Sequence, residues 1–189
     1  MKVVFINAVC GTGSTGRIVM DLYTVLKQKG CQAKIAYGDG NVKGINNEDL
    51  FKINNKIGYY SHNAFSRITD RAGFYSSIQT KRLIKWIDRE NPDIVHLHNL
   101  HGYYLNIKML FSYLRKTERK VIWTLHDCWA FTGHCSYFSY VGCEKWRTEC
   151  KECVQKTLYP QSILFDQSRR NYKEKKELLQ NIFWKLLLC

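Results

Sequence analysis

The first forty residues place a glycine loop between a strand-like and a helix-like segment, and this order restricts the fold more than any other feature. Lys2–Val9 is an apolar run, Gly11-Thr-Gly-Ser-Thr-Gly16 follows it, and apolar residues then recur at helical spacing up to residue 30. A second short apolar run, Ala33–Tyr37, predicts the next strand. We therefore expect a β–α–β unit at the N-terminus, with Ser14 or Thr15 as the N-cap of its helix.

The same alternation continues along the chain. It predicts further strands at Asp93–His98 and Val121–Leu125, and helices near Lys56–Thr69, Ile78–Arg89, Ile107–Arg115 and Gln167–Leu179. Strands that alternate with helices favour a parallel sheet joined by right-handed crossovers. Because 189 residues suit one core, we expect a single α/β domain over residues 1–180, with helices on both faces of the sheet.

Polar side chains follow two of the predicted strands, where parallel sheets bind their ligands. His126 and Asp127 come directly after the strand that ends near residue 125, and they are our first candidates for site residues. His98 ends the preceding strand, Asn99 and His101 follow it, and all three are candidate substrate-binding residues. Each group thus stands at or just past the carboxyl end of a predicted strand, where it could face a ligand.

The glycine loop is a third candidate for ligand binding. Gly11, Gly13 and Gly16, with Ser14 between them, place backbone N–H groups at a helix N-terminus, which favours phosphate or another anion. The spacing matches the dinucleotide fingerprint, in which an acidic residue at the end of the second strand binds the ribose. Asp39 is the candidate for that residue, but it lies later in the chain than the fingerprint requires. A simple tight turn between strand and helix is the alternative. A Walker A loop is excluded because no Gly-Lys-Ser/Thr follows.

Residues 128–160 are rich in cysteine and aromatic residues and have no clear periodicity, which indicates a long functional or metal-stabilised loop. The chain does not start with a signal peptide, and this argues against disulfides. We expect a structural zinc site, and no catalytic metal, with the ligands Cys135, Cys143, Cys150 and Cys153. His134 or Cys128 could replace one ligand, and reduced thiols packed among aromatic rings are the alternative.

The chain is strongly basic, with a formal net charge of +13, so we expect phosphate-bearing partners or anionic lipid surfaces. Cationic and aromatic residues are interleaved over Lys52–Arg89, which suits peripheral contact with an anionic membrane. No apolar run is long enough to span a bilayer. We therefore expect a cytoplasmic protein, with contact to the inner face of the cell membrane.

Several motifs together resemble one enzyme family, the bacterial retaining glycosyltransferases of the GT-B fold, and within it a family-four-like subgroup. That subgroup builds capsular and other extracellular polysaccharides. The most specific motif is Trp123-Thr-Leu-His-Asp-Cys-Trp-Ala-Phe-Thr-Gly-His-Cys135. The others are Gly11–Gly16, Asp93–Asn106, Gly142–Trp146, Cys150-x-x-Cys153, Tyr159-Pro160 and Ser168-x-x-Asn171-x-x-x-Lys175.

The resemblance implies two Rossmann-like domains, with the acceptor held by the N-terminal one and the nucleotide-sugar by the C-terminal one. His126 corresponds to the family histidine that reaches the transferred sugar, and Asp127 either assists it or caps the following turn. The glycine loop corresponds to a loop near the donor diphosphate or the acceptor. A lipid-linked or saccharide acceptor is implied.

The chain also departs from that family pattern. A second Rossmann domain, the Glu-x7-Glu element and the Arg/Lys pair that neutralises the leaving diphosphate have no counterpart in the sequence. Residues 181–189 read as an apolar, truncated tail. We therefore expect an N-terminal half that is not active alone, because leaving-group stabilisation is a main source of rate.

Two other function classes remain open at this point. A zinc-stabilised, non-enzymatic module could bind nucleic acid or anionic surfaces, although no nucleic-acid motif is present and we do not expect nucleic acid as a partner. A nicotinamide-dependent oxidoreductase would depend on the glycine loop alone.

Overall fold

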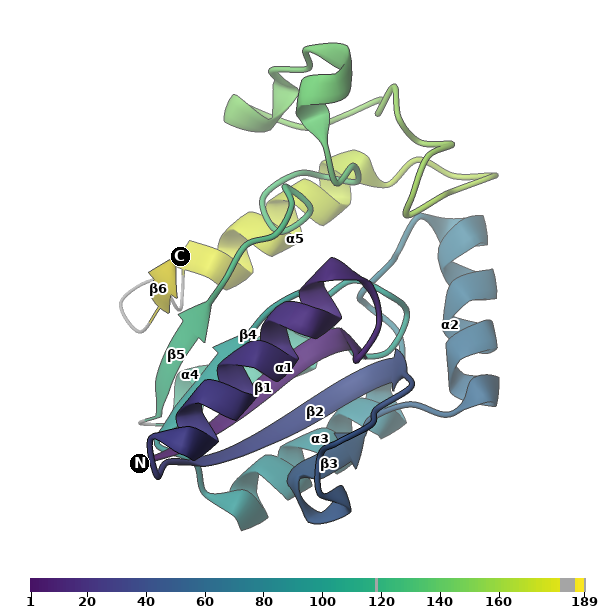
Figure 1. The fold of residues 1–189 in the computed structure, drawn as a ribbon. Helices are drawn as coiled ribbons and strands as arrows, with labels where there is room; N and C mark the ends of the chain where they lie inside the picture. Colours follow the sequence, from purple (N-terminus) through teal and green to yellow (C-terminus); the bar gives the residue numbers. More distant parts are fainter. Residues whose placement is uncertain (118, 181–185, 189) are drawn as a thin grey trace.

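The computed structural model describes residues 1–117, 119–180 and 186–188, and its centre is a six-stranded sheet (Figure 1). The strand order is β3-β2-β1-β4-β5-β6, and every neighbouring pair is parallel. The strands are β1 Lys2–Cys10, β2 Gln32–Gly40, β3 Leu50–Lys52, β4 Ile94–Leu97, β5 Lys120–Trp123 and β6 Leu186–Leu188. This is the Rossmann-like order, so the predicted fold class is confirmed.

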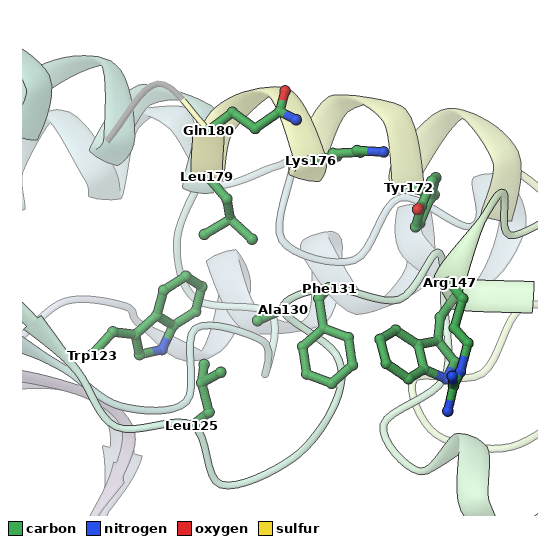
Figure 2. Close-up of a pocket in the computed structure, with 10 residues that line it drawn as sticks. Trp123, Leu125, Ala130, Phe131, Arg147, Tyr172, Lys176, Leu179 and Gln180 are labelled. Atoms are coloured by element: carbon green, nitrogen blue, oxygen red, sulfur yellow. The ribbon is translucent and has the colours of Figure 1, made fainter. Parts of the chain in front are cut away.

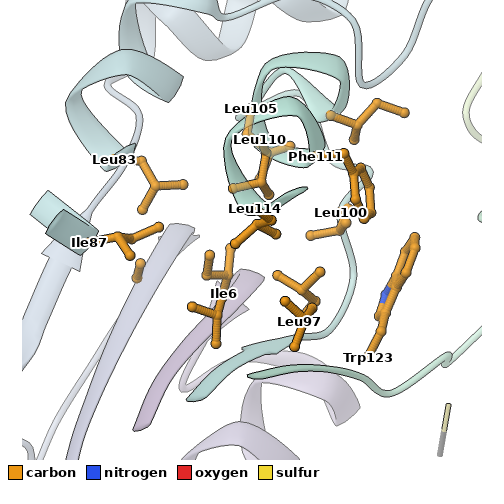
Figure 3. Close-up of a cluster of buried hydrophobic side chains, with 14 of the residues drawn as sticks. Ile6, Leu83, Ile87, Leu97, Leu100, Leu105, Leu110, Phe111, Leu114 and Trp123 are labelled. Carbon is orange, nitrogen blue, oxygen red and sulfur yellow. The ribbon is translucent and has the colours of Figure 1, made fainter. Parts of the chain in front are cut away.

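Helices cover both faces of the sheet, as predicted. They are α1 Gly13–Gln28, α2 Lys56–Thr69, α3 Ser77–Glu90, α4 Ile107–Lys116 and α5 Ser168–Gln180. The helix α1 covers one face, where its residues Val19 and Tyr23 pack with Phe5 and Ile35 of the sheet. The other face carries the larger core, to which α3, α4 and α5 contribute (Figure 3).

The alternation within β1 explains this two-layered packing. Successive side chains of a strand point to opposite faces, so Val3 and Phe5 meet α1 while Val4 and Ile6 enter the core under α3 and α4. All four side chains are at most 3% exposed. A strand that is apolar on both faces is the pattern expected for the middle of a parallel sheet.

Three predictions about local structure need correction. The N-cap of α1 is Thr12 rather than Ser14 or Thr15, because Gly13 already begins the helix. The short strand β3 has no counterpart among the predicted elements. Leu186–Leu188, part of the predicted tail, form a strand beside β5, and residues 181–185 and 189 lie outside the described part of the chain.

The helix α2 is joined to the loop after it through a buried histidine. The ring of His62 accepts a hydrogen bond at Nε2 from the backbone N–H of Gly73 (3.2 Å), and its Nδ1 pairs with the Ser76 hydroxyl (2.7 Å). An acceptor at Nε2 requires the proton to be on Nδ1, so the ring is neutral and donates to Ser76. Burial lowers the pKa of His62 to about 3.

Among the described residues, no helix is long and apolar enough to cross a membrane.

This burial predicts a defined pH dependence of stability. An unfolded histidine titrates near pH 6.5, so between pH 6.5 and about 3 the unfolded chain binds more protons than the folded one at this position. The free energy of unfolding therefore falls as the pH is lowered through that window, by about 1.4 kcal/mol per pH unit for each such group. Urea unfolding of His62→Gln between pH 6.5 and 4.5 should give a shallower loss than wild type; parallel curves would contradict the assignment.

Candidate active site at the carboxyl edge of the sheet

The structure brings the two predicted polar loops together. β4 and β5 are neighbours with Leu97 opposite Trp123, so the loops after them leave the same edge of the sheet side by side. A small cavity there is lined by all five predicted residues of these loops, namely His98, Asn99, His101, His126 and Asp127. The structure therefore brings these five residues to one place, while their chemical role stays a prediction.

A pair of histidines forms one half of this site. His98 Nδ1 and His126 Nε2 are 2.9 Å apart, and the two rings are stacked. Burial, together with the neighbouring His96 and His126, lowers the pKa of His98 to about 3. The pKa of His126 is also lowered, mainly by burial, although Asp127 opposes the shift. Both rings are therefore neutral at neutral pH, and the half-buried His126 can exchange hydrogen bonds with hydroxyl groups.

A chain of three polar groups forms the other half. His101 Nε2 lies 2.5 Å from Asp127 Oδ2, and its Nδ1 lies 3.0 Å from the hydroxyl of Tyr159. Asp127 Oδ1 accepts a second hydrogen bond from the backbone N–H of Trp129 (2.9 Å). Burial alone would raise the pKa of Asp127, but His101 and the Trp129 N–H together lower it, so the carboxylate is ionised at neutral pH.

Tyr159 and Asn7 belong to the site but were missed in the sequence. Asn7 is completely buried in β1, and its Oδ1 accepts a hydrogen bond from the backbone N–H of Asn99 (3.1 Å). Tyr104 donates to the carbonyl of Asn99 (2.7 Å), so that loop is held from both sides. A buried asparagine within an otherwise apolar strand was the available signal for Asn7. Tyr159 lies 58 residues from its partner in an aperiodic segment, which gives no such signal.

The glycine loop lies at the end of β1, next to this site, but it does not line the cavity. Gly11 and Gly13 have φ values of +71° and +64°, which side-chain-bearing residues rarely adopt. Gly16 packs the first turn of α1 closely against β1, since a Cβ there would lie 3.4 Å from the carbonyl oxygen of Val9. The loop therefore has a structural reason for its glycines, and its binding role, with that of the exposed Ser14, stays a prediction.

The cysteine-rich segment forms a separate cluster. A cavity of about 20 Å³ is lined by His134 and by the four predicted zinc ligands, Cys135, Cys143, Cys150 and Cys153. The structure thus brings the four thiols to one place. Among the residues that the structure describes, no group of three or more His, Cys, Asp or Glu side chains is arranged to hold a metal ion.

A larger pocket of about 590 Å³ lies on the other side of Trp123, Leu125 and Ala130, which also line the histidine cavity (Figure 2). Its remaining wall comes from α5 and from Phe131 and Trp146, with Arg147 and Lys176 as the cations. The lining is mostly apolar. The polar groups of this edge of the sheet therefore lie in the histidine and aspartate loops and not in this pocket.

The parallel sheet, with its polar residues gathered beyond β4 and β5, defines a Rossmann-like ligand-binding domain. The sequence model described as Glycosyltransferase Family 4 matches residues 15–170, and the chain therefore belongs to this family. It is 26% identical over 192 aligned positions to a protein of Escherichia coli (strain K12) named "Putative colanic acid biosynthesis glycosyl transferase WcaC". That match covers 96% of this chain and 46% of the relative, so the chain spans less than half of the relative's length.

The glycine loop offers a matched pair of substitutions. An alanine at Gly11 would place its Cβ 2.5 Å from the carbonyl oxygen of Asn41, whereas an alanine at Gly13 would meet open space. We expect Gly13→Ala to lower the free energy of unfolding by about 1–2 kcal/mol through backbone strain alone. Gly11→Ala should cost more, about 3 kcal/mol, because the clash adds to the strain. Denaturant unfolding measures both, and equal losses would argue against the described packing of this loop.

Proposed function

We propose that this chain is the N-terminal, acceptor-side domain of a retaining glycosyltransferase. In the complete enzyme, a sugar passes from a nucleotide-sugar to a lipid-linked or saccharide acceptor during polysaccharide biosynthesis. The family match and the name of the E. coli relative support this reaction class. The observation that carries the proposal is the position of His126, half-buried at the carboxyl edge and fixed by His98.

His126 is assigned to the transferred sugar. A neutral imidazole can donate to one hydroxyl or accept from another, and the contact with His98 limits rotation of the ring. Asp127 is not available as a base toward the substrate, because both of its oxygens already accept hydrogen bonds, one from His101 and one from the backbone of Trp129. We assign it to positioning of the loop that carries His126.

The donor side of the reaction is assigned to a domain outside these 189 residues. A departing nucleoside diphosphate needs cationic groups to stabilise its charge. The three basic residues closest in sequence to the candidate loops are Lys108, Arg119 and Lys120, and none of them lines the histidine cavity. We therefore propose that the chain alone does not catalyse transfer, and that the candidate site is completed when the donor-binding domain closes over it.

The role of His126 is tested in the complete enzyme. His126→Ala should lower kcat for sugar transfer by about 100-fold or more, because the sugar loses a positioned hydrogen-bonding partner. Thermal unfolding should change little, since His126 is only half-buried. His98→Asn should retain part of the activity, because it acts through His126. Unchanged transfer in His126→Ala would remove this residue from the mechanism.

We also propose that α2 brings the domain to the cytoplasmic face of the membrane. Ile57, Tyr60, Phe65 and Ile68 lie on one face of α2 and are 43–80% exposed. The exposed Ile163–Phe165 segment lies beside the end of the same helix, because its backbone N–H groups donate to Arg67 and Ile68. Such a stripe, with lysine and arginine at its border, fits the interface of an anionic bilayer.

The structure shows which residues of the basic segment Lys52–Arg89 are available for this membrane contact. Phe51 is stacked on Trp86, and Phe74 lies under the guanidinium of Arg71, so these aromatic rings pack inside the protein. Lys52 and Arg71 lie within ion-pair distance of acidic residues. Lys56 and Arg67 of α2 are exposed next to the apolar stripe, and they are the cations assigned to lipid headgroups.

Vesicle binding tests this surface with a matched control. The double variant Ile57→Gln/Phe65→Gln should bind vesicles of phosphatidylglycerol and phosphatidylcholine about tenfold or more weakly than wild type, because two apolar side chains no longer enter the lipid. The control variant Ile18→Gln/Val25→Gln changes two exposed apolar residues of α1, which are 40% and 46% exposed, and should bind as wild type does. Equal binding by the two double variants would exclude α2 as the contact.

A further inference from the structure

Residues 124–167 fold back on the domain with little regular structure of their own. Their helical content is two short 3-10 turns, η2 Phe138–Val141 and η3 Lys145–Arg147, and this segment projects from the sheet in Figure 1. A segment of this length without helices or strands needs another source of order. The four thiols that line one small cavity in its middle are the most distinctive group available for that purpose.

A buried histidine marks the same cavity as a polar site. His134 is 2% exposed, and its Nδ1 is hydrogen-bonded to the carboxylate of Asp70. Its Nε2 is buried without a partner in good hydrogen-bond geometry, although the backbone of Leu158 lies near the ring, and the side chain lines the cavity beside the thiols. A buried imidazole nitrogen in this position can donate a hydrogen bond to a group held in the cavity. A carboxylate that fixes one imidazole nitrogen is also the usual outer partner of a metal site.

The thiols are close to one another and to a buried cation. The Cys135 and Cys153 thiols interact by a side-chain hydrogen bond, and Cys150 and Cys143 are the next acidic groups around Cys135. Lys175, 3% exposed, donates to the carbonyl of Trp129 (2.6 Å) and has Cys150 as its strongest acidic neighbour. Burial lowers the pKa of Lys175 to about 7, and the net charge of −2 on four thiolates around a divalent ion would favour its charged form.

We propose that Cys135, Cys143, Cys150 and Cys153 bind one structural Zn²⁺, with the Nε2 of His134 hydrogen-bonded to a ligand sulfur. Zinc takes four thiolates in a tetrahedron at about 2.3 Å, and the C-x2-C turn supplies two adjacent ligands. The described thiols surround the cavity without being arranged to hold an ion. Binding therefore requires their side chains to turn toward the centre of the cavity, with release of the thiol protons.

The proposed ion would stabilise a segment that reaches the candidate active site. Tyr159 follows the last cysteine by six residues, and its hydroxyl contacts His101, which in turn contacts Asp127. At the other end, Asp127 and Trp129 precede the first ligand. A structural zinc between these two ends fixes both of them relative to each other.

The metal is tested on the purified 189-residue chain. Elemental analysis should find one zinc per chain, and chelation should lower the melting temperature by roughly 10 °C or more. Titration of the reduced, metal-free chain with Co²⁺ should give the intense sulfur-to-cobalt absorption of a four-thiolate tetrahedron. Failure of both zinc and cobalt to bind would overturn the proposal, as would a disulfide between Cys135 and Cys153 in freshly purified protein.

Three variants assign the ligands. Cys150→Ser should lose stoichiometric zinc, whereas the control Cys31→Ser, at a half-buried cysteine outside the cavity, should keep one zinc per chain. His134→Ala should also keep one zinc, with weaker binding, because it removes a hydrogen bond and not a ligand. Loss of stoichiometric zinc in His134→Ala would overturn the four-thiolate assignment, and retention of one tightly bound zinc in Cys150→Ser would exclude Cys150.

Discussion

The parallel pairing of β1, β4 and β5 is the constraint on which the candidate site depends. Because all three strands run in the same direction, their carboxyl ends lie at one edge, and the loops that follow them become neighbours. Asn7 then reaches across from β1 to the loop after β4, and His98 reaches the loop after β5. A shift of one residue in this register would turn each of these side chains to the opposite face. The site is therefore specified by the apolar pattern of the strands as much as by its own polar residues.

A single buried carboxylate joins the parts of the chain that the sheet does not organise. Asp70 ends α2 in the left-handed conformation, and its side chain accepts hydrogen bonds from His134 and from the backbone of Gln167. Its own carbonyl accepts from the side chain of Asn171 in α5 (2.6 Å). One residue thus connects α2, the cysteine-rich segment and α5. A buried carboxyl group with this many hydrogen bonds fixes the relative positions of the three segments. Loss of any one of these hydrogen bonds would lower the stability of the domain.

The sequence predicted the regular elements well, because their apolar periodicity is strong. The predicted helix Lys56–Thr69 has the observed bounds of α2, and the strand after Pro92 was placed within one residue of β4 at each end. The candidate residues His98, Asn99, His101, His126 and Asp127 were recognised by their position at or just past a strand end, and the structure shows that they line one cavity. The partners of these residues could not be predicted in the same way. Tyr159 and Asp70 act through contacts between distant segments, for which local patterns carry no information, and only Asn7 had a local signal, as a polar residue in an apolar strand.

The ties between α2 and α5 also determine when the domain can be completed during synthesis. Arg71 is hydrogen-bonded to Asn171 and Glu174, and Asp70 to Gln167 and Asn171, across sequence separations of 97 to 103 residues. The β1–α1–β2 unit needs only the first forty residues, so it can form while most of the chain is still being translated. The end of α2 must wait until residue 174 has left the ribosome. Until then this end of the helix lacks the partners that fix it in the complete domain, so α2 is docked later than the β1–α1–β2 unit.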